Sequence, residues 1–223
     1  MYQELVLNND PKSVISETIR TLRTNLQFAS VDKKIKTILI TSSVPGEGKS
    51  FIAANLACAF AQSGSRVLLV DCDIRKGRQH YIFNSHNKSG LSNLLLENVK
   101  EKYIDYIQET RIKNLSVMFR GVTPPNPSEL LGSSKNKELI EILRNEYDIV
   151  IFDSAPINGG LTDSIIMSTL VDGVVVVSSC KETPISLLNN TKKSLQNVNA
   201  NILGVVLNRA SSKSKKYYGH YYG

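Results

Sequence analysis

Five short apolar runs, each ending in polar residues, are the feature of this sequence that most constrains its fold. They read KTILIT, RVLLVDCD, DIVIFDSAP, GVVVVSS and ILGVVLNR. Unalternating runs of this kind are typical of strands that are covered on both faces, as in parallel sheets. Helical candidates lie between them at 135–146, 162–171 and 184–198, and LSVMFRG predicts a further strand. The alternation predicts an α/β fold, a doubly wound and mostly parallel sheet with helices on both faces and a crevice at the carboxyl ends of the strands.

Length and composition indicate one globular domain. A chain of 223 residues can bury a full core without disulfides, and its cysteines, Cys58, Cys72 and Cys180, have no metal-ligand spacing. No apolar run approaches the roughly 20 residues of a membrane span, and the first residues lack the pattern of a signal peptide. We therefore expect a cytoplasmic protein with a folded domain over 1–210 and a flexible tail over 211–223.

A first helix is predicted near the start of the chain. Asp10 and Pro11 are typical of a helix N-cap and first turn. An apolar stripe then follows at helical spacing, made of Ile15, Ile19, Leu22 and Leu26. The opposite side of this helix carries Glu17, Arg20 and Arg23.

The segment SSVPGEGKS joins a predicted strand to a predicted helix and has the character of a phosphate-binding loop. Glycines at 46 and 48 leave backbone amides free to approach phosphate oxygens at the positive end of the helix. Lys49 would reach the β- and γ-phosphates, and the Ser50 hydroxyl would bind magnesium. Ser43 stands where the common pattern has glycine. A glycine-rich turn with an exposed lysine is the alternative. The predicted nucleotide-binding residues here are Ser43, Pro45, Gly46, Glu47, Gly48, Lys49, Ser50 and Phe51.

Three aspartates follow two of the apolar runs. Asp71 and Asp73 end VLLVDCD, and Asp153 ends DIVIFD. Each aspartate alone could simply occupy a turn after a strand. In a parallel sheet, however, both strand ends reach the same crevice, and a buried carboxylate is costly unless it is paired or faces a metal. With Lys49, the three aspartates predict a magnesium–nucleotide site. Lys49, Asp71, Asp73 and Asp153 are the catalytic candidates, and Ser50 and the three aspartates are the metal-ligand candidates.

The end of the chain, SSKSKKYYGHYYG, concentrates four of the nine tyrosines within six residues. Such a segment could be an ordered terminal strand, a basic tail for RNA or membrane, or an accident of composition. It could also be a substrate, with the hydroxyl groups as its functional part. The residues alone leave these alternatives open.

The motifs TSSVPGEGKS, VLLVDCDIRKG and DIVIFDSAP together resemble the bacterial tyrosine kinases, the BY-kinase family. The resemblance covers essentially the whole chain. GVTPPNPSELLGS at 121–133 is similar to the proline-rich segment of the family, and ETIRTLR to its E-x-x-R-x-x-R helix. The resemblance implies a P-loop NTPase type of sheet and an ATP-dependent protein-tyrosine kinase that regulates capsular and exopolysaccharide synthesis. It also implies autophosphorylation of the terminal tyrosines Tyr217, Tyr218, Tyr221 and Tyr222.

The resemblance further implies roles and partners. Asp71 would be the base that accepts the tyrosine proton. Asn208 and Arg209 would lie near the adenine, and an ordinary turn at the end of a strand is the alternative for this pair. A contact in a homo-oligomer, such as a ring, would be formed by Glu17, Arg20 and Arg23. Periodicity alone favours the alternative, a solvated face with a local pair of Glu17 and Arg20. A separate membrane-spanning activator, protein-tyrosine substrates and a counteracting phosphatase would be the partners, with recruitment to the inner face of the cell membrane.

Two positions depart from the family pattern. Ala155 replaces a second proline, and Gly77 replaces a common proline after the Arg-Lys pair. Neither change removes a charged or metal-binding group, so we expect activity to survive both.

Two alternatives remain from the sequence. A partition- or septum-type P-loop ATPase would bind DNA or membrane, but its signature lysine is missing where Val44, Pro45 and Gly46 stand. That class also gives no reason for a tail with four tyrosines, and we expect no nucleic-acid partner. A nucleotide-gated scaffold whose basic tail binds acidic surfaces is the non-catalytic alternative.

Overall fold

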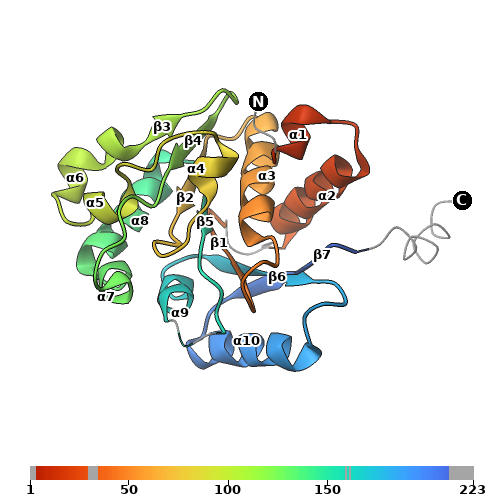
Figure 1. The fold of residues 1–223 in the computed structure, drawn as a ribbon. Helices are drawn as coiled ribbons and strands as arrows, with labels where there is room; N and C mark the ends of the chain where they lie inside the picture. Colours follow the sequence, from red (N-terminus) through yellow and green to blue (C-terminus); the bar gives the residue numbers. More distant parts are fainter. Residues whose placement is uncertain (1–3, 30–34, 159, 161, 211–223) are drawn as a thin grey trace, which may run out of the picture.

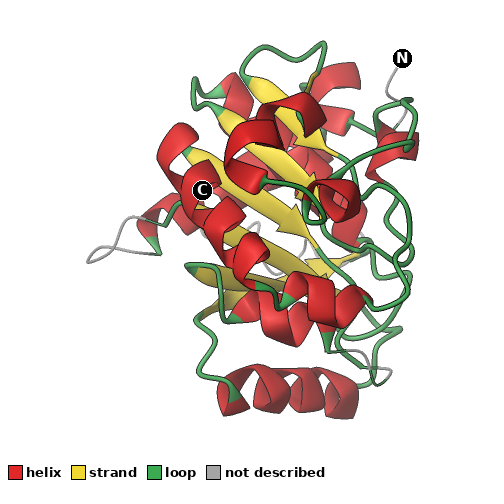
Figure 2. Ribbon diagram, turned by 90° about the vertical axis from the view of Figure 1, so that its left-hand side faces the viewer, coloured by secondary structure: helices red, strands yellow, loops and turns green. Residues whose placement is uncertain are grey.

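A seven-stranded sheet forms the centre of the protein in the computed structural model, which describes residues 4–29, 35–158, 160 and 162–210. The strand order is β3-β4-β2-β5-β1-β6-β7, and only the pairing of β3 with β4 is antiparallel. Figure 2 shows the strands side by side, with helices packed against them. The strands are β1 (Thr37–Ser42), β2 (Val67–Asp71), β3 (Gln108–Glu109), β4 (Leu115–Met118), β5 (Ile149–Asp153), β6 (Gly173–Ser179) and β7 (Ile202–Asn208).

Helices cover both faces of this sheet (Figure 1). The helices within residues 6–62 pack on one face, and the helices within residues 134–197 pack on the other. The helices are α1 (Val6–Asn9), α2 (Val14–Phe28), α3 (Lys49–Gln62), α4 (Gln79–Ile82), α5 (Leu91–Leu94), α6 (Val99–Lys102), α7 (Pro127–Leu131), α8 (Ser134–Glu146), α9 (Asp163–Ser168) and α10 (Ile185–Asn197), with a 3-10 turn at Tyr103–Tyr106. The predicted doubly wound, mostly parallel architecture is confirmed.

Helix α3 is buried on nearly all its sides, which explains its composition. Every residue from Ile52 to Ala61 is buried. A helix that is apolar all round must be enclosed. The sheet contacts one side of α3 and helix α2 contacts another. The many alanines in FIAANLACAFA allow this close packing of α3 against the sheet and α2.

The start of α2 differs from the prediction. Ser13, and not Asp10, is the N-cap, and its hydroxyl accepts a hydrogen bond from the backbone N–H of Ser16 at 3.2 Å. Asp10 instead follows the short helix α1, and its carbonyl accepts from the Ser16 hydroxyl at 2.7 Å. Consequently Ile15 is 51% exposed and Ser16 is buried, so Ile15 does not belong to the apolar stripe that contacts the core.

The last apolar run also differs from its prediction. ILGVVLNR forms β7, which pairs only with β6 among the described strands and lies at the edge of the sheet. Val205 is 48% and Leu207 is 61% exposed, so this run is not covered on both faces. An unalternating run is typical of a central strand but does not reveal a strand's position in the sheet.

Parallel pairing brings the polar strand ends together on the side of the sheet where the parallel strands terminate, here called the carboxyl edge. Asp71 at the end of β2 is in register with Asp153 at the end of β5, and β5 pairs in turn with β1, which leads into α3. The predicted tail, 211–223, lies outside the described residues. None of the helices in the described part of the chain is long and apolar enough to cross a membrane.

Candidate functional site

The phosphate loop, residues 43–50, leaves β1 at the carboxyl edge and enters α3. Gly46 and Gly48 have φ angles of +85° and +92°, in the left-handed region that favours glycine. At Gly48 a Cβ atom would lie 2.2 Å from Nδ2 of Asn208. Glycine at this position therefore allows both the turn and the close approach of β7, and the loop enters α3 at the positive end of that helix.

Buried polar side chains hold the phosphate loop in this shape. The Glu47 carboxylate accepts hydrogen bonds from the backbone N–H of Val44 at 2.8 Å and of Ser179 at 3.0 Å, and from the Thr183 hydroxyl. The Ser43 hydroxyl accepts from Thr191 of α10 at 2.9 Å. Ser43, which replaces a common glycine, thus joins the loop to α10, and Glu47 joins it to the end of β6.

Asn208 and Arg209 lie against the phosphate loop. Asn208 Nδ2 donates to the Glu47 carbonyl at 2.8 Å, and the Arg209 guanidinium donates to the Gly46 carbonyl at 2.9 Å. Arg209 also forms an ion pair with Glu182 at 2.6 Å. The structure therefore places both residues at the predicted site, where their side chains donate to backbone carbonyls of the loop. Their contact with adenine remains a prediction.

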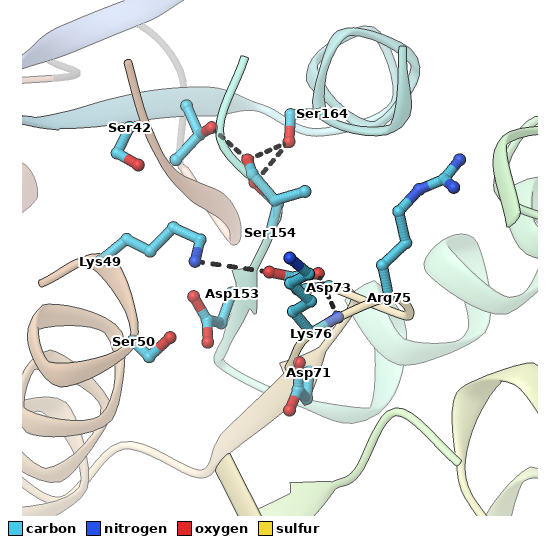
Figure 3. A network of polar contacts seen from close by, with 12 residues as sticks. Ser42, Lys49, Ser50, Asp71, Asp73, Arg75, Lys76, Asp153, Ser154 and Ser164 are labelled. Carbon is cyan, nitrogen blue, oxygen red and sulfur yellow. Dashed lines mark hydrogen bonds and ion pairs between the residues drawn. The ribbon is translucent and has the colours of Figure 1, made fainter. Parts of the chain in front are cut away.

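Lys49, the first residue of α3, extends toward Asp73, which follows the end of β2. Its ammonium lies 3.4 Å from Oδ2 of Asp73, and both side chains are largely buried. Asp73 also accepts a hydrogen bond from the backbone N–H of Lys76 at 2.9 Å. Figure 3 shows Lys49 reaching Asp73, with the Ser50 and Asp153 side chains close by and Asp71 beyond them. The five predicted catalytic and metal-binding residues are thus gathered at the carboxyl edge.

Asp71 and Asp153 are fully buried, and each has one oxygen, Oδ1, without a hydrogen-bond partner in the described residues. Burial raises the pKa of Asp71 well above its usual range, and the neighbouring Asp153 adds to this effect. Burial also raises the pKa of Asp153, although Lys49 and hydrogen bonds from Gln79 and Ser50 oppose the change. Two buried carboxylates side by side favour a cation or a proton between them.

These donors fit magnesium. The described residues contain no group of three or more His, Cys, Asp or Glu side chains close enough to enclose a metal ion by themselves. Magnesium is usually held by one or two carboxylates, with water and substrate phosphates completing the octahedron. The free Oδ1 atoms of Asp71 and Asp153 and the Ser50 hydroxyl are hard oxygen donors of this kind. They are the residues that would hold the ion.

Two contacts of this site were not expected from the sequence. Gln79 donates from its side chain to Oδ2 of Asp153 at 2.8 Å and from its backbone to Oδ2 of Asp71 at 3.1 Å. A Cβ atom at Gly77 would lie 2.1 Å from Oδ1 of Asp71. The side chain that is missing at position 77 therefore leaves room for the Asp71 carboxylate, so this departure from the family pattern touches the site directly. No spacing or motif pointed to either contact.

A second network of hydrogen bonds and ion pairs joins residues 73–76, which follow β2, to the proline-rich segment at 121–133. Arg75 forms an ion pair with the buried Asp163 of α9 at 2.7 Å, and Asp163 accepts from the Ser128 hydroxyl at 2.5 Å. Arg120 donates to the Ile74 carbonyl at 3.1 Å. The segment 121–133 is thereby fixed beside residues 73–76. The sequence singled out this segment only through its family resemblance, and Asp163 carried no signal.

The charged residues of α2 divide into two groups. Glu17 and Arg20 form an ion pair near the surface, whereas Arg23 is partly buried and donates to the Ala59 carbonyl of α3 at 3.2 Å. Arg20 is also partly buried, and the predicted role of all three residues in a subunit contact stays a prediction. The predicted phosphoacceptors, Tyr217, Tyr218, Tyr221 and Tyr222, lie outside the described residues.

A phosphate loop at a helix N-terminus, beside carboxylates that end neighbouring parallel strands, defines the class of P-loop nucleotide-binding proteins. Comparison with known proteins agrees. A family model described as an AAA domain matches residues 35–204.

Comparison with individual proteins identifies the family within this class. The tyrosine-protein kinase YwqD of Bacillus subtilis is 41% identical over 221 residues, which span 99% of this chain and 92% of YwqD. The crystal structure of the chimerical protein CapA2B2 superimposes with a TM-score of 0.88 at 43% identity, over 94% of this chain and 91% of that one. The kinase domain of the Escherichia coli tyrosine kinase ETK gives 0.85 at 32% identity, over 94% and 82% of the two chains. The chain belongs to the bacterial tyrosine kinase family, and its enzyme class is that of a protein-tyrosine kinase.

Proposed function

We propose that the chain transfers the γ-phosphoryl group of ATP to tyrosines of its own C-terminal cluster, between subunits, and that it thereby regulates capsular or exopolysaccharide synthesis. The observation that carries this proposal is the convergence of Lys49 with Asp71, Asp73 and Asp153 at the mouth of the phosphate loop. Residues 1–210 would form the kinase domain and residues 211–223 its substrate tail.

The chain's own residues account for the main requirements of phosphoryl transfer. The amides of the phosphate loop would bind the phosphates, and Lys49, now 3.4 Å from Asp73, would neutralise charge on the transferring group. The tyrosine oxygen forms a bond to the γ-phosphorus while the bond from phosphorus to the ADP oxygen breaks. Magnesium, when bound, would neutralise part of the negative charge on the phosphate oxygens.

Asp71 is the residue best suited to accept the tyrosine proton. A tyrosine of pKa about 10 is protonated at neutral pH, so the proton must leave as the new bond forms. Burial raises the pKa of Asp71, which makes its carboxylate a stronger base than an exposed aspartate. Its Oδ1 atom has no hydrogen-bond partner in the described residues and is therefore free to receive that proton or to bind the ion.

Electrostatics supports binding of the unmodified tail at the site and release of the phosphorylated tail. Each phosphate adds about −1.5 to −2 charges, so four modified tyrosines would add roughly −6 to −8. The tail carries Lys213, Lys215 and Lys216, and the net charge of the whole chain is +7. An unmodified cationic tail would bind at an acidic crevice, and a phosphorylated tail would be repelled from it.

The proposed contact with a neighbouring subunit is formed by Glu17, Arg20 and Arg23 of α2, although Glu17 pairs with Arg20 and Arg23 donates to α3 within the same chain. A separate membrane-spanning activator would recruit the protein to the inner face of the membrane. Protein-tyrosine substrates and a phosphatase would complete the cycle.

The experiment that tests exchange between subunits mixes two variants with radioactive ATP. One chain carries Lys49→Met, and the other is active but has phenylalanine at all four tail tyrosines. Label should appear on the tail of the Lys49→Met chain. If that tail stays unlabelled while the unsubstituted protein labels itself, transfer is within one chain and exchange between subunits is wrong. As a control, the active chain with phenylalanine at its four tail tyrosines should not be labelled when it is incubated by itself.

A further inference from the structure

Gln79 lies between three elements of the site. It is the first residue of α4, and its side chain is completely buried. Its Nε2 atom donates to Oδ2 of Asp153 at 2.8 Å and to the Ser50 carbonyl at 3.1 Å, while its backbone N–H donates to Oδ2 of Asp71 at 3.1 Å. One residue thus contacts the ends of β2 and β5 and the first turn of α3.

These bonds determine which oxygens remain available. An amide nitrogen has two hydrogens, and both are used, so the orientation of the Gln79 amide is fixed. The Oδ2 atoms of Asp71 and Asp153 are occupied, and their Oδ1 atoms are left without partners in the described residues. Oε1 of Gln79 is likewise buried without a hydrogen-bond partner there. Three unpartnered oxygens therefore belong to one bonded group, which is rare in a protein interior.

We propose that Gln79 is a positioning residue for the metal: it holds Asp71 and Asp153 so that their Oδ1 atoms face the magnesium ion of the nucleotide, and its own Oε1 accepts from water bound to that ion. This inference rests on the proposed function. A neutral amide suits the task, because it fixes two carboxylates without adding a charge. A lysine would compete with the ion, and a glutamate would add a third negative charge.

Outer hydrogen bonds of this kind orient metal ligands, and their loss typically lowers metal affinity by about 10- to 100-fold. A merely structural Gln79 would instead fasten α4 to the sheet. That role would leave the magnesium dependence of binding unchanged, or would weaken nucleotide binding equally with and without the ion. Magnesium dependence therefore separates the two roles.

The test is calorimetric titration of the 223-residue chain with ADP, with and without magnesium. Gln79→Met keeps the length of the side chain and the backbone donor to Asp71 but removes the amide. We expect its affinity for ADP without magnesium to stay within about twofold of the unsubstituted protein, and the gain on adding magnesium to fall about 10- to 100-fold. Gln108→Met makes the same change on the exposed strand β3 and should keep the full gain.

Three results would overturn the proposal. Gln79→Met could keep the full magnesium gain, or it could lose affinity equally under both conditions. If the unsubstituted protein itself shows no magnesium gain, the proposed function fails and this inference fails with it, which the first two results do not imply. Should Gln79→Met not fold, judged by its circular dichroism and thermal unfolding, Gln79→Ala tests the same expectation, since it also retains the backbone donor.

Discussion

Aspartates at the two edges of the same sheet have opposite surroundings. At the carboxyl edge, Asp71 and Asp153 are buried, each with an oxygen that lacks a donor in the described residues, and burial raises the pKa of both. At the opposite edge, where β1 and β6 begin, Oδ2 of Asp172 accepts hydrogen bonds from the N–H of Lys36, and from the N–H and hydroxyl of Thr37, each at 2.9 Å. Its other oxygen pairs with Arg144 at 3.2 Å.

The difference distinguishes a functional from a structural carboxylate. Burial alone would raise the pKa of Asp172, but the hydrogen bonds from Lys36 and Thr37 and the Arg144 charge outweigh it and hold the pKa below its usual value. The charge of Asp172 is stabilised within the chain and ties the start of β1 to β6. The charges of Asp71 and Asp153 are only partly balanced, by Lys49 and Gln79, so they favour a bound cation. The sheet edge whose carboxylates are only partly neutralised within the chain is therefore the one suited to bind a cation.

The largest effect is expected from the cation of the carboxyl edge. Lys49→Met should reduce labelling of the chain with radioactive ATP by about 10³-fold or more, because charge on the transferring phosphoryl group loses its partner. Lys36→Met is the matched control at the other edge, where the ammonium donates to the Arg144 carbonyl at 3.0 Å. It should leave labelling intact. Labelling of Lys49→Met at the unsubstituted rate would remove Lys49 from the site.

Asp71→Asn should lower the rate of transfer by about 10²- to 10³-fold, since an amide cannot accept the tyrosine proton. The same change should stabilise the nucleotide-free protein by about 1 kcal/mol, because the new amide nitrogen can donate to Asp153 where two buried carboxylates now adjoin. Labelling and thermal unfolding without magnesium measure the two effects. A lower unfolding temperature would contradict the view that adjacent buried carboxylates destabilise the nucleotide-free protein.

Asp172→Asn should have the reverse pattern. It removes the charge that accepts three hydrogen bonds and pairs with Arg144, so we expect a loss of about 1–3 kcal/mol in the free energy of unfolding. For a chain of this size that corresponds to roughly 2–4 °C in unfolding temperature for each kcal/mol. Labelling per folded molecule should not change. A loss of labelling without a loss of stability would show that the two edges are not separate in function.

The smallest effect concerns pH. The pKa of Asp172 is lowered in the folded state, so its stabilising contribution is fully present above the unfolded value of about 3.9 and is lost as pH falls through the folded value. The difference in unfolding free energy between the unsubstituted protein and Asp172→Asn should be constant above about pH 5 and should shrink below pH 4. Urea unfolding at several pH values measures it. A difference that stays the same at low pH would exclude the charge as its source.

Much of the architecture could be predicted from the sequence because it depends on neighbouring residues. Apolar runs specify buried strands, and glycines at 46 and 48 with Lys49 specify the loop that enters α3. Aspartates that directly follow a strand must lie where that strand ends. The gathering of Asp71 and Asp153 at one edge therefore follows from parallel pairing alone.

The tertiary structure decided what depends on residues distant in sequence. Only the packing of the elements places β7 as the last strand of the sheet, so that Leu207 is exposed. The side chain of Gln79 reaches Asp153, which is 74 residues away in the sequence. No local pattern encodes such a contact, because the free energy that fixes it comes from burial of a polar group among partners that only the folded chain brings together.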